Sequence, residues 1–202
     1  MSLRHQPKAA LINDFSGFGR CSVTVALPII SQMKVQCCPV LTSVFSNHTG
    51  YPSFYFDDYT EKMPSYIAEW KKLNLHFECI AAGFLGSERQ IEIVKNFIRD
   101  FKDETTKVLI DPVMGDHGRT YQTFTPEMCS QMKQLAHFAD ILTPNLTEAC
   151  ILTDTPYHDG HWQMSELAEL ALSLIAMGPS KVVITGVSMG TFIGNVICES
   201  GG

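Results

Sequence analysis

The chain has few positively charged residues, and its cysteines lack the spacing of a disulfide scaffold or a zinc site. Its 15 Lys and Arg residues are outnumbered by 21 Asp and Glu residues, which leaves a net charge of −6. A broad basic surface for a nucleic-acid backbone is therefore absent, and nucleic acid is disfavoured as a partner. The seven cysteines are odd in number and include no Cys-x-x-Cys pair. Neither a secreted disulfide scaffold nor a zinc ribbon is indicated, and we expect reduced thiols.

Long apolar runs are also missing. No segment reaches the roughly 18 unbroken apolar residues that a membrane helix needs, and the amino-terminal residues lack a basic flank followed by a signal-type apolar run. We therefore expect no membrane partner and a cytoplasmic location. Because 45% of the residues are hydrophobic and 18% are charged, we expect a folded chain with a sizeable core.

The sequence does contain a regular alternation of short apolar runs with stretches of helical period. The apolar runs lie at 9–14, 37–46, 78–86, 107–113, 140–145 and 181–186. The helical stretches lie at 18–34, 61–73, 87–102, 126–138, 146–153 and 165–177. This order predicts a three-layer α/β fold with a mostly parallel central sheet and helices on both faces. We expect one domain over residues 1–202, with a loop or small flap in the aromatic segment 47–60.

Polar residues and glycines gather directly after the expected strands. Ligands of open parallel sheets bind at the carboxyl ends of the strands, so these segments predict the site. "DPVMGD" at 111–116 places two carboxylates close together, and they repel each other unless a cation or hydrogen-bond donors compensate. Mg²⁺ shared with substrate phosphates is the economical explanation, and a solvated acidic turn is the alternative. Asn145 and Glu148 follow the next strand, where the three-residue spacing also suits a helix cap.

Three other patterns are weaker. "GVSMG" at 186–190 matches a nucleophile elbow around Ser188, but no His follows and the next segment reads as a strand, so a hairpin is favoured over a hydrolase. "GFGRCS" at 17–22 lacks the third glycine of a dinucleotide fingerprint, and a tight turn is favoured. His158 and His161 have no third ligand nearby, which favours a solvated loop over a metal site.

Five segments in order resemble the pyridoxal kinase branch of the ribokinase-like superfamily: 12–20, 46–51, 111–116, 143–149 and 181–186. "INDFSGFGR" at 12–20 is also similar to the opening of hydroxymethylpyrimidine kinases. The resemblance implies transfer of the ATP γ-phosphate to the 5′-hydroxymethyl group of pyridoxal, pyridoxamine or pyridoxine, with ATP and Mg²⁺ as cofactors. Dependence on a monovalent cation and assembly as a homodimer are left open.

The resemblance also implies roles for individual residues. It places the substrate at Asp14, His48, Thr49 and Phe84, the nucleotide at Asp111, Asn145, Glu148 and Thr185, and the metal at Asp116 and Glu148. From the sequence alone, His48 is equally well explained as a turn residue with a local hydrogen bond.

One family segment has no counterpart. The catalytic base of the family is an Asp in a Gly-Thr-Gly-Asp segment, which does not occur in this sequence, so the base is expected beyond Gly202 and no catalytic residue is assigned. We expect a C-terminally incomplete kinase domain that is inactive as it stands. The alternatives are a hydroxymethylpyrimidine (phosphate) kinase and a truncated, non-catalytic ligand-binding form.

Overall fold

The structure is a computed structural model that describes residues 6–121 and 123–201. Contacts divide the chain into two compact units, Met1–Lys107 (unit 1) and Val108–Gly202 (unit 2). The single domain expected over residues 1–202 stays a prediction.

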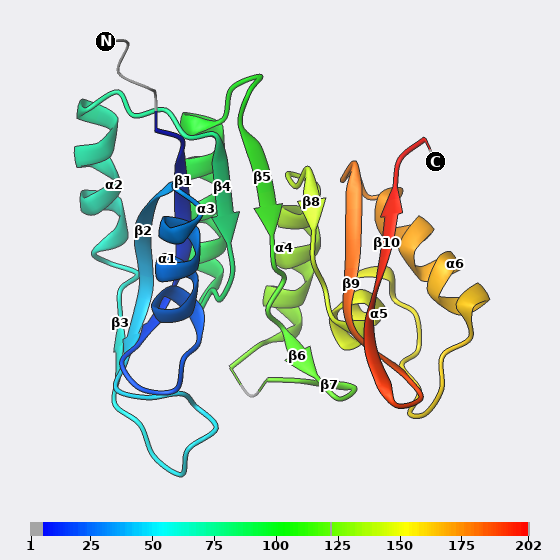
Figure 1. The fold of residues 1–202 in the computed structure, drawn as a ribbon. Helices are drawn as coiled ribbons and strands as arrows, with labels where there is room; N and C mark the ends of the chain where they lie inside the picture. Colours follow the sequence, from blue (N-terminus) through cyan, green and yellow to red (C-terminus); the bar gives the residue numbers. More distant parts are fainter. Residues whose placement is uncertain (1–5, 122, 202) are drawn as a thin grey trace. The chain divides into compact units, whose positions relative to one another are not determined.

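Unit 1 is a four-stranded sheet with helices on both faces. Its elements are β1 (Lys8–Ser16), α1 (Ser22–Gln32), β2 (Gln36–Phe45), β3 (Phe56–Asp58), α2 (Met63–Lys72), β4 (Cys79–Ala82) and α3 (Glu88–Phe101). The strand order is β4-β1-β2-β3, in which β1 is parallel to β2 and β4, and β3 is antiparallel to β2. Helix α1 lies in front of the strands and α3 lies behind them (Figure 1).

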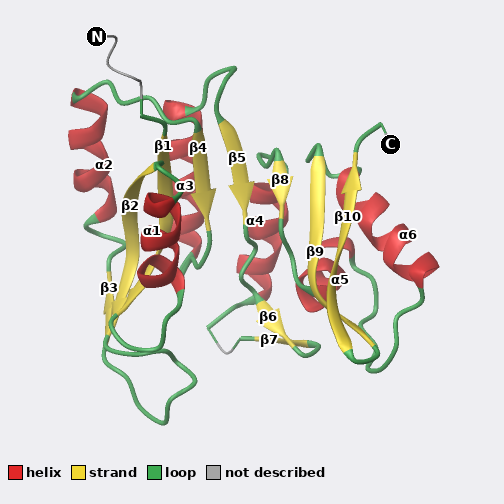
Figure 2. Cartoon of the chain, viewed as in Figure 1, coloured by secondary structure: helices red, strands yellow, loops and turns green. Residues whose placement is uncertain are grey.

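Unit 2 repeats the pattern of a parallel sheet that ends in one antiparallel strand. Its elements are β5 (Lys107–Ile110), β6 (Gly115–Asp116), β7 (Arg119–Thr120), α4 (Pro126–Ala136), β8 (Ile141–Leu142), α5 (Leu146–Thr153), α6 (Met164–Ile175), β9 (Lys181–Met189) and β10 (Phe192–Glu199). The strand order is β10-β9-β8-β5, and only β10 is antiparallel to its neighbour. The mostly parallel α/β fold is thus confirmed, and the alternation of helices and strands can be followed in Figure 2.

The segment "GVSMG" forms a hairpin. Strands β9 and β10 pair around it, with Ser188 opposite Ile193. A nucleophile elbow needs a helix after the serine, whereas here a strand follows. The hairpin interpretation is therefore confirmed.

One helix of unit 1 is capped as expected, and two elements differ from the expectation. The Ser87 hydroxyl accepts a hydrogen bond from the Gln90 N–H and caps α3, as the sequence predicted. Helix α1 begins at Ser22 rather than at residue 18, because residues 17–20 form a turn. Within the aromatic segment 47–60, the structure forms the edge strand β3.

An aromatic cluster forms the core between α2, β4 and α3. It contains Trp70, Phe77, Phe97 and Phe101, with ring centroids 4.5 to 6.2 Å apart. Phe77 is completely buried. Such rings remove large apolar areas from water and favour the tilted and edge-to-face contacts seen here. This cluster anchors α2 and α3 to each other and to the start of β4.

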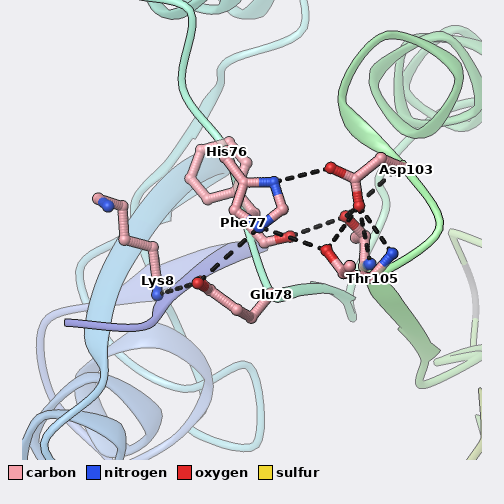
Figure 3. Close-up of polar contacts among 7 residues, drawn as sticks. Lys8, His76, Phe77, Glu78, Asp103 and Thr105 are labelled. Atoms are coloured by element: carbon pink, nitrogen blue, oxygen red, sulfur yellow. Dashed lines mark hydrogen bonds and ion pairs between the residues drawn. The ribbon is translucent and has the colours of Figure 1, made fainter. Parts of the chain in front are cut away.

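A polar cluster lies beside the aromatic core at the amino ends of β1 and β4 (Figure 3). The Lys8 N–H donates to Glu78 Oε2 at 2.6 Å, and His76 Nδ1 lies 2.9 Å from Asp103 Oδ2. Hydrogen bonds from Thr105, its hydroxyl first, hold the pKa of Asp103 at about 2, well below its ordinary value. These contacts hold the first residues of β1 and β4 in place. They lie at the amino edge of the sheet of unit 1, whereas the predicted substrate residues lie at its carboxyl edge.

Within the described part of the chain, no helix combines the length and the apolar character that crossing a membrane requires.

Replacing Phe77 by Ala should lower the free energy of unfolding by about 3 to 5 kcal/mol, because it leaves a cavity among three other rings. The matched control is Leu73→Ala, since Leu73 is 66% exposed and its loss should cost less than about 0.5 kcal/mol. Urea unfolding followed by tryptophan fluorescence measures both. Equal effects of the two substitutions would contradict a packed cluster around Phe77.

Candidate functional site

The predicted site residues fall into two sets, one in each unit. The residues expected to contact substrate lie in unit 1: Asp14, His48, Thr49 and Phe84. Those expected to contact nucleotide or metal lie in unit 2: Asp111, Asp116, Asn145, Glu148 and Thr185. In each unit they occupy strand ends or the segments that follow them, at the carboxyl edge of the sheet.

Asp14 is a buried carboxylate near the end of β1. It is 5% exposed, and its Oδ2 accepts a hydrogen bond from the Ser16 hydroxyl at 3.0 Å. The register between β1 and β2 shifts between Asn13 and Phe15, and such irregularities redirect side chains near functional sites. A buried carboxylate with one hydroxyl partner among the described residues retains acceptor capacity for a ligand that donates hydrogen bonds.

The turn after β1 is joined to the loop after β2 by backbone hydrogen bonds. The Gly17 N–H donates to Phe45 O at 3.0 Å, and the Phe18 N–H donates to Ser46 O at 3.1 Å. In return, the His48 N–H donates to Phe18 O at 2.8 Å. Gly19 has a φ of +123°, and a Cβ there would lie 2.7 Å from the His48 Cβ. Only glycine allows the two loops to approach this closely.

His48 is held in one orientation. Its Nδ1 accepts a hydrogen bond from the Gly50 N–H at 3.0 Å, so a neutral His48 carries its proton on Nε2. The ring is exposed and offers a donor at Nε2. Thr49 is exposed on the same turn. A pocket of about 420 Å³ opens beside this turn, lined by Gly17, Phe18, Gly19, Arg20, Thr24 and Tyr51.

Phe84 follows β4 and is half-buried. Its ring packs edge-on against Phe45, with the centroids 5.9 Å apart and the planes at 68°. Phe45 in turn contacts Phe54 and Phe56, so an aromatic layer lies at the end of β2. A planar heterocycle would find an apolar partner in this layer.

In unit 2, the segment after β5 turns into a small hairpin that carries Asp116. Strands β6 and β7 pair through Asp116 and Arg119, around a two-residue turn at His117 and Gly118 in which both residues have positive φ. The Asp116 carboxylate is about half exposed, and its Oδ1 accepts from the His117 N–H at 2.8 Å.

Glu148 ties this segment to helix α5. Its Oε1 accepts from the Met114 N–H at 3.1 Å, and its Oε2 accepts from the Asn145 N–H at 2.8 Å. The Asn145 Oδ1 accepts from the Glu148 N–H, which completes the capping box that the sequence spacing suggested. The Asn145 Nδ2 also donates to Gly115 O at 2.9 Å. Capping and the proposed ligand role therefore involve the same two side chains.

Burial sets the acidity of the carboxylates in unit 2. Loss of hydration raises the pKa of Glu148 to about 8, and the charge of Asp111 adds to the rise. Loss of hydration also raises the pKa of Asp111 to about 6. Burial raises the pKa of Tyr121, and the charges of Glu148, Asp116 and Asp111 raise it further. The charges of all three acids thus lie near enough to the Tyr121 phenol to affect its pKa.

Tyr121 was missed by the sequence reasoning. It stands five residues after Asp116, outside any recognised motif, and its N–H donates to Met114 O at 2.9 Å. Only the return of the hairpin brings it beside the acids, so no signal in the sequence would have identified it.

Thr185 meets Asn145 at the end of β9. The two residues form an isolated parallel bridge, and the Thr185 N–H donates to Pro144 O at 2.8 Å. The half-buried Thr185 side chain therefore lies beside the cap of α5.

The acids of unit 2 fit a hard cation that is shared with a ligand. Their donors are carboxylate oxygens, and the raised pKa values of Asp111 and Glu148 show that burial disfavours the charged form, which a cation would stabilise. Among residues 6–121 and 123–201, no three His, Cys, Asp or Glu side chains could hold a metal by themselves. Mg²⁺ commonly takes one or two carboxylates and completes its shell with water and phosphate oxygens.

The other candidate motifs have local explanations. The ring of His158 stacks on Trp162 with centroids 4.1 Å apart, and its Nε2 lies 3.4 Å from Glu166 Oε1. The segment 17–20 forms the tight turn described above.

The chain matches the model of the phosphomethylpyrimidine kinase family over residues 27–201. A pyridoxal kinase from Arabidopsis thaliana is 31% identical over 161 residues, which cover 75% of this chain and 49% of that protein. The chain thus spans about half the length of that relative.

Two crystal forms of a candidate phosphomethylpyrimidine kinase from Bacteroides thetaiotaomicron have a similar fold. The rhombohedral form is 45% identical with a TM-score of 0.93, over 98% of this chain and 69% of that one. The orthorhombic form contains pyridoxal and is 47% identical with a TM-score of 0.88, over 93% of this chain and 65% of that one.

Replacing Asp111 by Asn should remove a pH-dependent loss of stability. An acid whose pKa is higher in the folded than in the unfolded state destabilises the fold as pH rises between the two values. For Asp111 that window runs from 3.8 to about 6. The advantage of Asp111→Asn over the unsubstituted protein should grow by about 3 kcal/mol between about pH 4 and pH 7.

Urea unfolding at a series of pH values measures this difference, and Asp159→Asn in an exposed loop is the control. If the stability difference between Asp111→Asn and the unsubstituted protein does not change with pH, or shrinks as pH rises, burial does not raise the pKa of Asp111.

Proposed function

Because the chain belongs to the phosphomethylpyrimidine kinase family, we propose that the protein phosphorylates the 5′-hydroxymethyl group of a B6 vitamer, namely pyridoxal, pyridoxamine or pyridoxine, with ATP and Mg²⁺. The observation that carries this proposal is the pyridoxal bound by a protein 47% identical to this chain. The turn at 46–51 and the aromatic layer at Phe84 suit a polar, planar ring.

The substrate residues would bind and orient the vitamer. Asp14 would accept hydrogen bonds from the polar edge of the ring, and His48 would donate one from Nε2. The Phe84 ring would pack against the heterocycle. Orientation alone accounts for a large part of the acceleration of a reaction between two bound molecules.

The acidic residues would place the nucleotide. Asp116 and Glu148 would hold Mg²⁺, Asp111 would lie near the phosphates, and Asn145 and Thr185 would contact phosphate oxygens. When bound, Mg²⁺ supplies neutralisation of the charge on the transferred phosphoryl group. We assign no general base among these residues, and use of a monovalent cation stays open.

A hydroxymethylpyrimidine (phosphate) kinase is the alternative, and the name of the matching family agrees with it. The two activities share the phosphoryl transfer and differ in the ring that unit 1 would bind. Turnover rates of pyridoxal, pyridoxamine and hydroxymethylpyrimidine by the intact protein distinguish the two activities. Calorimetry measures the binding of each compound.

Faster turnover of pyridoxal or pyridoxamine supports the proposal, and preference for the pyrimidine overturns it. Binding of vitamer and Mg²⁺-ATP without turnover would instead support a non-catalytic ligand-binding protein.

A homodimer stays a prediction, and helix α1 is the surface that supports it. The helix carries no charged residue, yet Val25, Leu27, Ile29 and the adjacent Met33 are exposed. A surface helix ordinarily presents a charged or polar face to water, so this one suits contact with a second copy.

A substitution in each unit should weaken the binding of one ligand and spare the other. Asp116→Asn should weaken binding of Mg²⁺-ATP about tenfold and leave pyridoxal binding nearly unchanged. The substitution removes the negative charge of a carboxylate that would bind Mg²⁺. Asp14→Asn should weaken pyridoxal binding by a similar factor and spare the nucleotide. Calorimetric titration of each ligand measures both, and each variant is the control for the other. If Asp116→Asn impaired pyridoxal more than Mg²⁺-ATP, its assignment would be refuted.

A further inference from the structure

Asn13 has no role in the site described above, yet it contacts two residues of that site. Its Oδ1 accepts a hydrogen bond from the Asp14 N–H at 3.0 Å and another from the Phe84 N–H at 3.0 Å. Both partners are donors, so the orientation of the amide is fixed, with its oxygen toward them. One oxygen thus holds the backbone of two proposed substrate residues from two strands.

The position of Asn13 explains why a side chain is needed there. Strands β1 and β4 pair in register as far as Ile12 and Ala82, and the Gly83 N–H still donates to Ile12 O at 2.9 Å. The next N–H after it, that of Phe84 beyond the end of β4, bonds to the side chain of Asn13. Asn13 therefore extends the connection between the strands by one residue beyond the backbone ladder.

Gly83 has no side chain, and this leaves the space that the Asn13 amide occupies. A Cβ on Gly83 would lie 2.5 Å from Asn13 Nδ2 and 2.9 Å from Asn13 Cγ, closer than non-bonded atoms approach. Any larger residue at position 83 would push the amide away from the Phe84 N–H. The contact therefore depends on the pair of Asn13 and Gly83.

We propose that Asn13 is a positioning residue that holds Asp14 and Phe84 in register with each other for the vitamer. This inference rests on the proposed function, because it gives Asn13 its purpose in that same site. Asp14 and Phe84 would contact different parts of one ring, so a shift of one strand end relative to the other would misalign them. Supporting hydrogen bonds of this kind fix the geometry of binding residues.

Two substitutions at position 13 test the proposal in the intact protein. Asn13→Leu keeps the shape but removes the acceptor, and Asn13→Asp keeps the acceptor. Asn13→Leu should weaken pyridoxal binding about tenfold, because it leaves two N–H groups without their partner. Asn13→Asp should keep the affinity within about threefold of the unsubstituted protein. Calorimetry measures pyridoxal and, separately, a non-hydrolysable ATP analogue with Mg²⁺.

A positioning role predicts loss for pyridoxal and no change for the nucleotide analogue. Equal weakening of both ligands, or unchanged pyridoxal affinity in Asn13→Leu, would overturn it. If the unsubstituted protein binds the nucleotide analogue but not pyridoxal, the proposed function itself fails, and the inference fails with it. If instead the unsubstituted protein binds pyridoxal and substitutions at position 13 do not change the affinity, only the inference about Asn13 fails.

A double-mutant cycle with Gly83 gives a second readout. Gly83→Ala should weaken pyridoxal binding when Asn13 is present, because the new methyl group displaces the amide. In an Asn13→Ala background the space is empty, and Gly83→Ala should have little further effect. Additive effects would show that Gly83 acts independently of Asn13 and would contradict the proposal.

Discussion

In each unit, one side-chain acceptor holds two backbone N–H groups near the carboxyl ends of the strands. In unit 1 the amide oxygen of Asn13 accepts from Asp14 and Phe84. In unit 2 the carboxylate of Glu148 accepts from Met114 and Asn145. Buried N–H groups are costly when unpaired, so these two acceptors stabilise the segments that carry the site residues. Asp14 and Phe84 in unit 1, and the start of α5 in unit 2, are held by these two acceptors.

The choice of acceptor differs between the units for an electrostatic reason. A neutral amide in unit 1 satisfies two N–H groups without adding charge beside the buried Asp14. In unit 2 the acceptor is itself a carboxylate, which burial and the charge of Asp111 drive toward protonation. An arrangement built only for stability would avoid such crowding of acids, because it costs free energy in the absence of a cation. The disfavoured charge is consistent with a site for a metal-bound phosphate.

Much of the architecture was predictable from sequence because it depends on local patterns. Apolar runs identified most of the strands, and the spacing of Asn145 and Glu148 identified a helix cap. The edge strand β3 and the hairpin β6–β7 were not predicted, since two or three residues carry too little periodicity. Tyr121 and the contact between Asn13 and Gly83 were also missed. Both depend on how distant segments meet, which no local pattern encodes.

The residues proposed for the substrate lie in unit 1 and those proposed for metal and nucleotide lie in unit 2, which bears on substrate choice. The acids of unit 2 would interact with phosphate and metal, which are the same for a pyridine and for a pyrimidine substrate. Discrimination between the two rings must then arise in unit 1, where Asp14, His48 and Phe84 offer a buried acceptor, an oriented donor and an aromatic face. Each of these groups is held through its backbone or by a local hydrogen bond. Residues that hold these groups in place, Asn13 among them, would therefore affect specificity together with the residues that would touch the substrate.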